Sequence, residues 1–178
     1  RHGARRMESL IQDLLAYTKA ARYEDSRPPG ADTGRVLASV LENLKGPLEQ
    51  AGAAVTQTAL PVVAMHESRL GQVLQNLIGN ALKYRGAEPP QVHISASEQD
   101  GWCVLSVADN GIGIEPRFAD LIFGLFKRLH TQDQYPGSGI GLSICQRIVE
   151  RYGGRIWLEK SISNQGSTFC FSVPIRGQ

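Results

Sequence analysis

Four polar side chains recur at helical spacing near the middle of the sequence. Asn76, Asn80, Lys83 and Tyr84 fall at positions i, i+4, i+7 and i+8, which share one face of a helix. A carboxamide oxygen is a neutral hard ligand that suits Mg²⁺, and an ammonium group one turn further on can meet phosphate oxygens. The same pattern also fits an ordinary solvated helix face, so at this point both interpretations stay open.

Two glycine-containing segments have the composition of ligand-binding turns. The segment 109–113 (DNGIG) follows an apolar run, and its carboxylate can accept a hydrogen bond from an amino group; a simple Asp-Asn-Gly turn is the alternative. The segment 137–142 (GSGIGL) precedes a helical pattern, so unpaired N–H groups at the helix start can receive phosphate. This second segment lacks the Gly-Lys-Ser/Thr ending of a Walker-type loop and the strand-then-helix setting of a Rossmann turn.

The elements that must position these groups alternate between helical and strand patterns. Apolar residues keep helical spacing over 36–52, 68–84 and 140–152. Strand patterns occupy 54–58, 62–65, 92–96, 103–107, 155–159 and 168–173, with a hairpin turn at 99–101. We expect an α+β two-layer sandwich with helices on one face of a mixed sheet, and a mobile loop with one or two helical turns over 115–139.

The N-terminal residues form a separate pattern. Apolar positions over 7–21 alternate in steps of four and three, the spacing of helices that pack in bundles, although an amphipathic helix lying on its own domain fits as well. A polar stretch rich in helix breakers follows over 24–32 and indicates a domain boundary near residue 30.

Charge and cysteine usage exclude several classes of protein. Nineteen Lys and Arg against seventeen Asp and Glu give a net charge of +2, which disfavours a nucleic-acid partner. Cys103, Cys145 and Cys170 are widely spaced in apolar runs, which indicates buried thiols rather than a disulfide or zinc framework. No apolar run approaches the roughly 20 residues of a membrane span. We expect a cytoplasmic segment without membrane contact, whose parent protein is either soluble or membrane-anchored.

Four segments, in order, resemble the sequence boxes of the GHKL ATP-binding fold, and of histidine kinases in particular. The N box is similar to residues 72–84 and the G1 box to 109–113, while the F box resembles 122–128 and the G2 box 137–142. The resemblance implies the Bergerat ATP-binding fold. The surroundings of residues 126–137 look most like those of phytochrome-type kinases.

The resemblance implies a role for each matched residue. Those implied to hold Mg²⁺ and the ATP phosphates, with Asn80 as metal ligand, are Asn76, Asn80, Lys83, Tyr84, Gly137, Gly139, Gly141 and Leu142. Those implied to contact adenine and to hinge the loop over it are Asp109, Gly111 and Gly113. Those implied to act catalytically at the γ-phosphate are Asn76, Arg128 and the helper Lys127.

The resemblance also implies an organisation and a reaction. Residues 1–24 would be the C-terminal part of a dimerisation and phosphotransfer hairpin, 25–32 a linker and 33–178 the catalytic domain. The domain would transfer the γ-phosphoryl group of ATP to a histidine upstream of the sequence, for relay to a response-regulator receiver domain, within a homodimer. We therefore expect that the chain lacks its own phosphoacceptor.

Two other classes of function stay open. A GHKL ATPase carries a Glu one helical turn before the metal-binding Asn to activate water, whereas this chain has Asn76 there, which cannot act as a general base. A non-catalytic module that binds nucleotide for regulation is the second alternative. Fold resemblance alone does not decide among these functions.

Overall fold

The computed structural model describes residues 15, 18, 28–127, 129, 135 and 138–176. The helix predicted over 7–21 lies outside these residues except for Leu15 and Thr18, which are helical. The division into a hairpin segment, a linker and a catalytic domain therefore stays a prediction. Ala31 is fully buried and pairs with Val63, so the folded unit includes the end of the range expected to be a linker.

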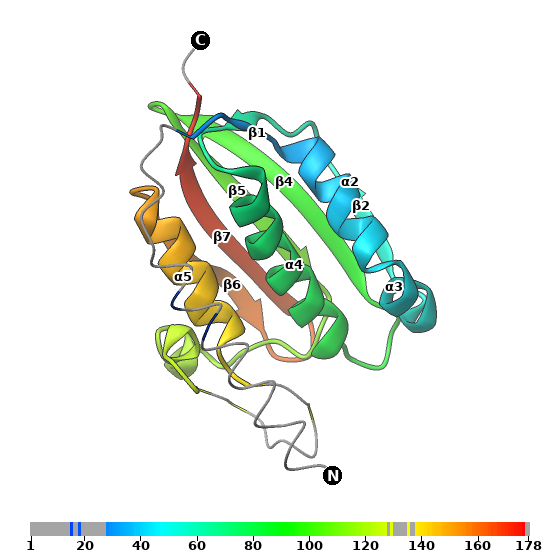
Figure 1. The fold of residues 1–178 in the computed structure, drawn as a ribbon. Coiled ribbons are helices and arrows are strands. Elements are labelled where there is room, and N and C mark those ends of the chain that lie inside the picture. Colours follow the sequence, from blue (N-terminus) through cyan, green and yellow to red (C-terminus); the bar gives the residue numbers. More distant parts are fainter. Residues whose placement is uncertain are drawn as a thin grey trace.

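A five-stranded mixed sheet forms one layer of the molecule, and Figure 1 shows it behind the helices. Its spatial order is β2 (Ala54–Gln57), β4 (Gln91–Gln99), β5 (Trp102–Asp109), β7 (Gly166–Pro174) and β6 (Ile156–Ile162). β2 runs parallel to β4, and all the other neighbours are antiparallel. A second, two-stranded sheet pairs β1 (Ala31–Asp32) with β3 (Val62–Val63).

The helices cover one face of the large sheet, as predicted (Figure 1). They are α2 (Thr33–Asn43), α3 (Lys45–Ala51), α4 (Glu67–Lys83) and α5 (Gly141–Arg151). The predicted sandwich of helices on a mixed sheet is confirmed. Two 3₁₀ turns, η1 (Pro116–Phe118) and η2 (Leu121–Phe123), lie within the loop where one or two helical turns were expected.

The apolar pattern over 36–52 predicts helix throughout, but the structure contains two helices with a break at Leu44. Pro47 explains the break, because it has no N–H to donate to the carbonyl of Asn43 and its ring clashes with that carbonyl in a continuous helix. In the first turn of α3 the same residue costs little, since N–H groups there have no partner within the helix.

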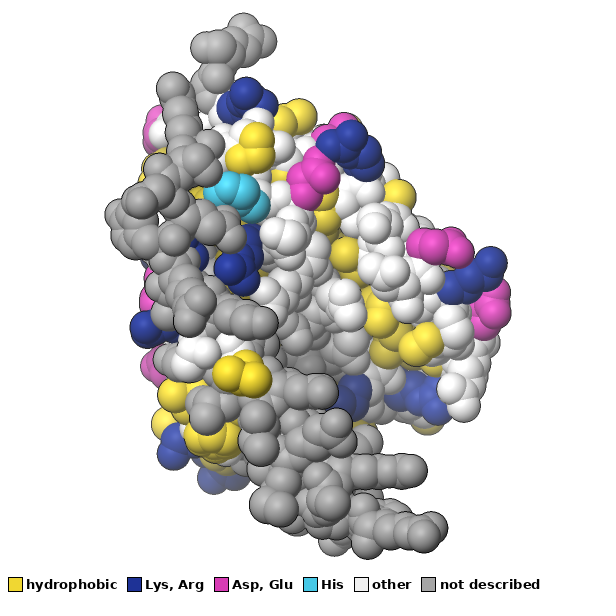
Figure 2. All heavy atoms as spheres, in the orientation of Figure 1, with side chains coloured by type: hydrophobic (Ala, Val, Ile, Leu, Met, Phe, Trp, Pro, Cys, Tyr) yellow, Lys and Arg dark blue, Asp and Glu magenta, His cyan; other side chains and the backbone are white. Residues whose placement is uncertain are grey.

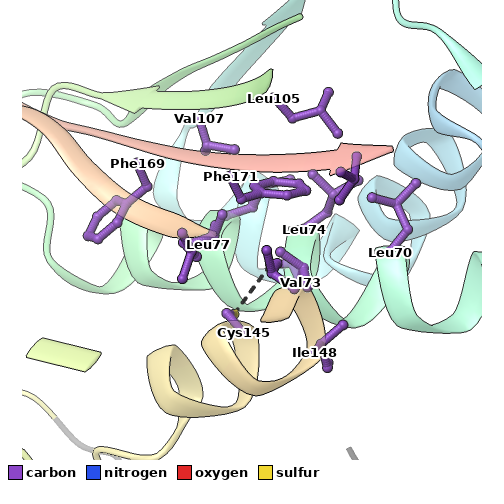
Figure 3. Packing of buried hydrophobic residues seen from close by; sticks show 14 of the residues in the cluster. Leu70, Val73, Leu74, Leu77, Leu105, Val107, Cys145, Ile148, Phe169 and Phe171 are labelled. Carbon is purple, nitrogen blue, oxygen red and sulfur yellow. Dashed lines mark hydrogen bonds between the residues drawn. The ribbon is translucent and has the colours of Figure 1, made fainter. Parts of the chain in front are cut away.

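The core lies between α4 and the sheet, and Figure 3 shows the side chains that fill it. Leu70, Leu74 and Leu77 are at most 1% exposed and pack with Leu105 and Phe171 from β5 and β7 in one buried cluster. Burial of a leucine side chain contributes roughly 1.5–3 kcal/mol to folding. Replacing Leu74 by Ala would cost about 2–5 kcal/mol, because the sheet cannot collapse into the space left behind.

Charged side chains are scattered over the helix-bearing face rather than gathered by sign (Figure 2). One pair there joins Arg35 on α2 to Glu67 at the start of α4. Among the residues that the structure places, no helix is both long enough and apolar enough to span a bilayer.

Candidate functional site

Three segments that are distant in the sequence meet where β5 ends. The Ile112 N–H donates to the carbonyl of Tyr84, the residue that caps α4, at 3.0 Å. The carbonyl of Ile112 accepts a hydrogen bond from the N–H of Asn164, in the turn between β6 and β7, at 2.8 Å. These two bonds fix the segment after β5 between the end of α4 and the edge of the sheet.

Asp109 is the last residue of β5, and its carboxylate is held by backbone donors. Its Oδ1 accepts the N–H of Gly111 at 2.7 Å and the N–H of Ser167 on β7 at 3.2 Å. Burial raises the pKa of Asp109 above its ordinary value, while these two hydrogen bonds act in the opposite direction. The carboxylate thus has a fixed orientation in a poorly solvated place.

A small cavity of about 80 Å³ opens beside this carboxylate. Its walls are mainly apolar and are formed by Asn80, Tyr84, Asp109, Ile112, Gly113, Ile114, Ile122, Lys127, Leu129, Leu142, Ser167 and Phe169. An apolar slot with one oriented carboxylate suits a flat ring that carries an N–H donor. We call this cavity the base compartment.

The two glycines of the 109–113 segment are required by close backbone contacts. Gly113 has a φ of +74°, and a Cβ there would lie 2.3 Å from the carbonyl oxygen of Ile162. A Cβ on Gly111 would lie 2.4 Å from the carbonyl oxygen of Tyr84. Glycine is therefore needed at these two positions because the chain's own backbone comes so close to them. Gly111 supports the site but lines neither the base compartment nor the second cavity, which is described next.

A wider hollow of about 400 Å³ lies along the polar face of α4. Its walls come from α4, the start of α5, the intervening loop and the break between α2 and α3: Leu44, Gln75, Asn76, Gly79, Asn80, Lys83, Tyr84, Ile122, Lys127, Ser138, Gly139, Gly141, Leu142 and Ile144. The predicted polar helix face is thus turned toward a cavity. The ammonium of Lys83 lies 4.5 Å above the ring of Tyr84. We call this hollow the phosphate compartment.

The two compartments adjoin, and five residues line both: Asn80, Tyr84, Ile122, Lys127 and Leu142. Asn80 therefore lies at the junction of the two compartments, where the ring of a bound ligand would connect to its charged end. Asn80 is the residue there that could hold a divalent cation, because Mg²⁺ takes oxygen ligands and is commonly held by few protein groups together with substrate phosphates. The described part of the chain contains no group of three or more His, Cys, Asp or Glu that could hold a metal ion.

Most of the predicted site residues come together around these compartments, and Arg128 and Gly137 lie outside the described residues. Sequence reasoning assigned no role to Ser167 and Phe169, which β7 brings to the base compartment. The alternation of Phe169 with Phe171 and Val173 could have indicated that Phe169 faces the helices.

The family of histidine kinase-, DNA gyrase B-, and HSP90-like ATPases matches residues 65–177, which include the whole base compartment and every residue of the phosphate compartment except Leu44. The chain belongs to this family. Cyanobacterial phytochrome A of Nostoc sp. is 42% identical over 176 residues, which cover 99% of this chain and 23% of that protein. The chain thus spans about a quarter of the length of this relative.

Two solved structures resemble the fold of this chain closely. Full-length ShkA in complex with AMPPNP has a TM-score of 0.78 at 29% identity, over 98% of this chain and 37% of that one. The nucleotide-free catalytic domain of the histidine kinase ThkA has a TM-score of 0.69 at 28% identity, over 82% of this chain and 93% of that one. Both likenesses confirm the fold expected of a histidine kinase catalytic domain.

Proposed function

We propose that this chain is the catalytic domain of a sensor histidine kinase, which binds ATP with Mg²⁺ and transfers the γ-phosphoryl group to a histidine on a helical hairpin. The observation that carries the proposal is the joining of two unlike compartments, one ending on Asp109 and the other lined by Asn76, Asn80 and Lys83. A purine and a polyphosphate need these two environments side by side. The AMPPNP complex of ShkA supports the same assignment.

In this proposal the base compartment recognises adenine. The exocyclic amine donates to the Asp109 carboxylate, whose orientation the Gly111 and Ser167 N–H groups already fix. Apolar side chains, Ile112 and Phe169 among them, exclude water from the ring. A hydrogen bond to a charged acceptor in such a place contributes about 1.5–3 kcal/mol, which is enough to select among bases.

The phosphate compartment would hold the triphosphate with its cation. Asn80 supplies the protein's oxygen to Mg²⁺, with Asn76 supporting cation and phosphates, while Lys83 and Tyr84 contact the nucleotide. Gly139, Gly141 and Leu142, at and just before the start of α5, line the same hollow, where unpaired N–H groups of the helix start would favour an anion. Gly137, which lies outside the described residues, is proposed to contact the phosphates as well.

In phosphoryl transfer, the domain would position the reacting groups and neutralise charge on the phosphates. A ring nitrogen of the acceptor histidine attacks the γ-phosphorus, the bond from that phosphorus to the β–γ bridging oxygen breaks, and ADP leaves with the electron pair. The proton displaced from the histidine passes to a base on the hairpin or to water. Asn76, Lys127 and Arg128 are the residues of this chain that we place at the γ-phosphate.

One observation favours phosphoryl transfer to a protein over hydrolysis. The described residues that line the phosphate compartment include carboxamides and lysines but no Asp or Glu. Asn76 occupies the place where a hydrolase would carry a general base, and a carboxamide cannot accept a proton from water at neutral pH. Among the described residues that line the phosphate compartment, none would therefore serve as a general base toward water.

The proposal extends to partners and setting. The acceptor would be an upstream hairpin of the same kinase, to which residues 1–24 would belong, and the next carrier a response-regulator receiver domain. We further propose a homodimeric, cytoplasmic kinase with residues 25–32 as its linker and 33–178 as the catalytic domain.

Incubation with γ-labelled ATP tests the proposal. With Mg²⁺ and a separately prepared phosphotransfer hairpin, we expect acid-labile label on the hairpin, and none on this chain incubated alone. Release of labelled phosphate without labelled protein would establish an ATPase instead. Nucleotide binding with neither outcome would establish a regulatory module.

A further inference from the structure

The side chain of Asn76 on α4 faces the first turn of α5. A Cβ built on Gly141 would lie 3.1 Å from Asn76 Oδ1 and 3.7 Å from its Cγ, closer to the oxygen than ordinary packing allows. Gly141 is not among the glycines with positive φ, so its backbone conformation does not require glycine. What requires glycine here is the space that the Asn76 carboxamide occupies.

Cys145 lies one turn further along α5, on the same side of that helix. Its side chain is buried, and its thiol donates to the carbonyl of Val73 on α4 at 3.9 Å (Figure 3). Burial raises the pKa of the Cys145 thiol to about 12, while a hydrogen bond with the Asn76 side chain acts in the opposite direction. At neutral pH the thiol is therefore protonated and serves as a small, neutral hydrogen-bonding group.

We propose that Gly141 and Cys145 are positioning residues, which hold the Asn76 carboxamide in the orientation that the Mg²⁺-bound phosphates need. Gly141 leaves room at the carboxamide oxygen, and Cys145 holds the group by a hydrogen bond while its thiol ties α5 to the α4 backbone. This inference rests on the proposed function, because it assigns Asn76 a place beside the nucleotide. It explains why a thiol stands at a core position that an alanine or valine would otherwise fill.

The proposal also links two parts of the phosphate compartment. Asn76 belongs to α4, whereas Gly141 belongs to the glycine segment that would receive phosphate, and both line the same hollow. A contact between them means that a displacement of the start of α5 also displaces Asn76. Cation binding and phosphate binding would then depend on one shared arrangement.

A buried thiol elsewhere in the core provides the matched control. Cys103 is fully buried on β5, and burial, with a smaller effect of Glu98, raises its pKa to about 11. It stands near the opposite end of that strand from Asp109. Cys103→Ala therefore removes the same atom from the core without touching the phosphate compartment.

The first arm of the test measures ADP affinity of the chain by calorimetry, with and without Mg²⁺. Cys145→Ala should weaken binding with Mg²⁺ by about five-fold and leave Mg²⁺-free binding unchanged, whereas Gly141→Ala, at a residue that we also place at the phosphates, should weaken both. Cys145→Ser, which keeps a hydrogen-bonding group, should restore most of the loss. In an Asn76→Ala background, Cys145→Ala should have no further effect on affinity. A loss in Cys145→Ala no greater than that in Cys103→Ala would overturn the inference.

The second arm uses the nucleotide-free protein, so that it does not depend on the proposed function. The side-chain amide resonances of Asn76 in a nitrogen–proton NMR spectrum should shift in Cys145→Ala and stay in place in Cys103→Ala. Unmoved Asn76 resonances in Cys145→Ala would overturn the inference whatever the protein binds. A wild-type chain that binds no ADP, with the shift present, would instead refute the proposed function and leave the contact established.

Discussion

The two ends of the candidate site are built differently. At the base end, backbone N–H groups from two segments fix a single carboxylate beside a cavity of about 80 Å³. At the phosphate end, a hollow of about 400 Å³ is lined by side chains of α4 and by a glycine-bearing segment. The first end is therefore preorganised by the sheet, whereas in our proposal the second is completed by the phosphates and the cation that bind there.

Because of this difference, the loss of a single group should affect the two ends to different extents. A preorganised acceptor costs no reorganisation when the ligand arrives, so its loss removes the full interaction. An end that shares a cation with its ligand distributes the binding energy over several groups, so the loss of one group has a smaller effect. A single substitution at the base end should therefore cause a large loss of nucleotide affinity. A single substitution at the phosphate end should cause a smaller loss, which depends on Mg²⁺.

Asp109→Asn should have the largest effect on nucleotide binding. The amide keeps an oxygen for the Gly111 and Ser167 N–H groups, but it loses the charge that would receive the adenine amine in our proposal. We expect ATP affinity to fall on the order of 100-fold, the equivalent of about 2.7 kcal/mol. Calorimetry with the folded variant measures it, and an affinity within a factor of three of wild type would contradict the assignment.

Gly113→Ala should damage the base end through its backbone. Both the φ of +74° and the 2.3 Å approach to the Ile162 carbonyl oppose a side chain, so we expect a loss of roughly 2–3 kcal/mol in unfolding free energy. Gly101→Ala is the matched control, because Gly101 has a φ of +80° but nothing within 4 Å of a new Cβ. Its cost should stay near 1 kcal/mol. Equal losses in urea titrations would show that the contact with β6 is unimportant.

Asn80→Ala should damage the phosphate end and only in the presence of the cation. Removal of one oxygen ligand should weaken Mg²⁺-dependent ADP binding by about ten-fold, since the phosphates and water retain the rest of the shell. Binding without Mg²⁺ should change little. The ratio of the two affinities is the measurement, and an equal loss under both conditions would place Asn80 on the nucleotide rather than on the metal.

The smallest effect concerns stability and pH. Because the folded pKa of Asp109 is raised above the ordinary value of 3.8, the unliganded fold binds that proton more tightly than the unfolded chain does. Its contribution is therefore fully present below that value and is lost as pH rises through the folded pKa. Asp109→Asn lacks this loss, so its melting temperature relative to wild type should increase with pH above about 4 and then level off. A difference that decreases with pH would show that the hydrogen bonds outweigh burial.

Sequence patterns predicted the parts of the site that depend on local order. Helical periodicity placed Asn76, Asn80 and Lys83 on one face, and the sandwich of helices on a mixed sheet followed from the order of the elements. The break at Leu44 also had a local cause, Pro47, whose effect the apolar pattern concealed.

What sequence patterns did not reveal depends on tertiary neighbours. Ser167 reaches Asp109 because β7 pairs with β5, and no spacing within either strand specifies that neighbour. The contact of Cys145 and Gly141 with Asn76 likewise depends on how α5 packs against α4. The sequence singled out the glycines of the 109–113 segment for contact with adenine, whereas their close approach to Tyr84 and Ile162 is known only from the folded chain.

Calorimetric titration of ADP and of GDP into the wild-type chain with excess Mg²⁺ tests directly whether Asp109 recognises the base. If Asp109 receives an amine in a preorganised slot, ADP should bind and GDP should bind at least about 100-fold more weakly, because guanine presents a carbonyl oxygen where adenine presents an amine. Removal of Mg²⁺ should weaken ADP binding without removing this preference. Equal affinity for the two nucleotides, or no binding of either, would contradict the account.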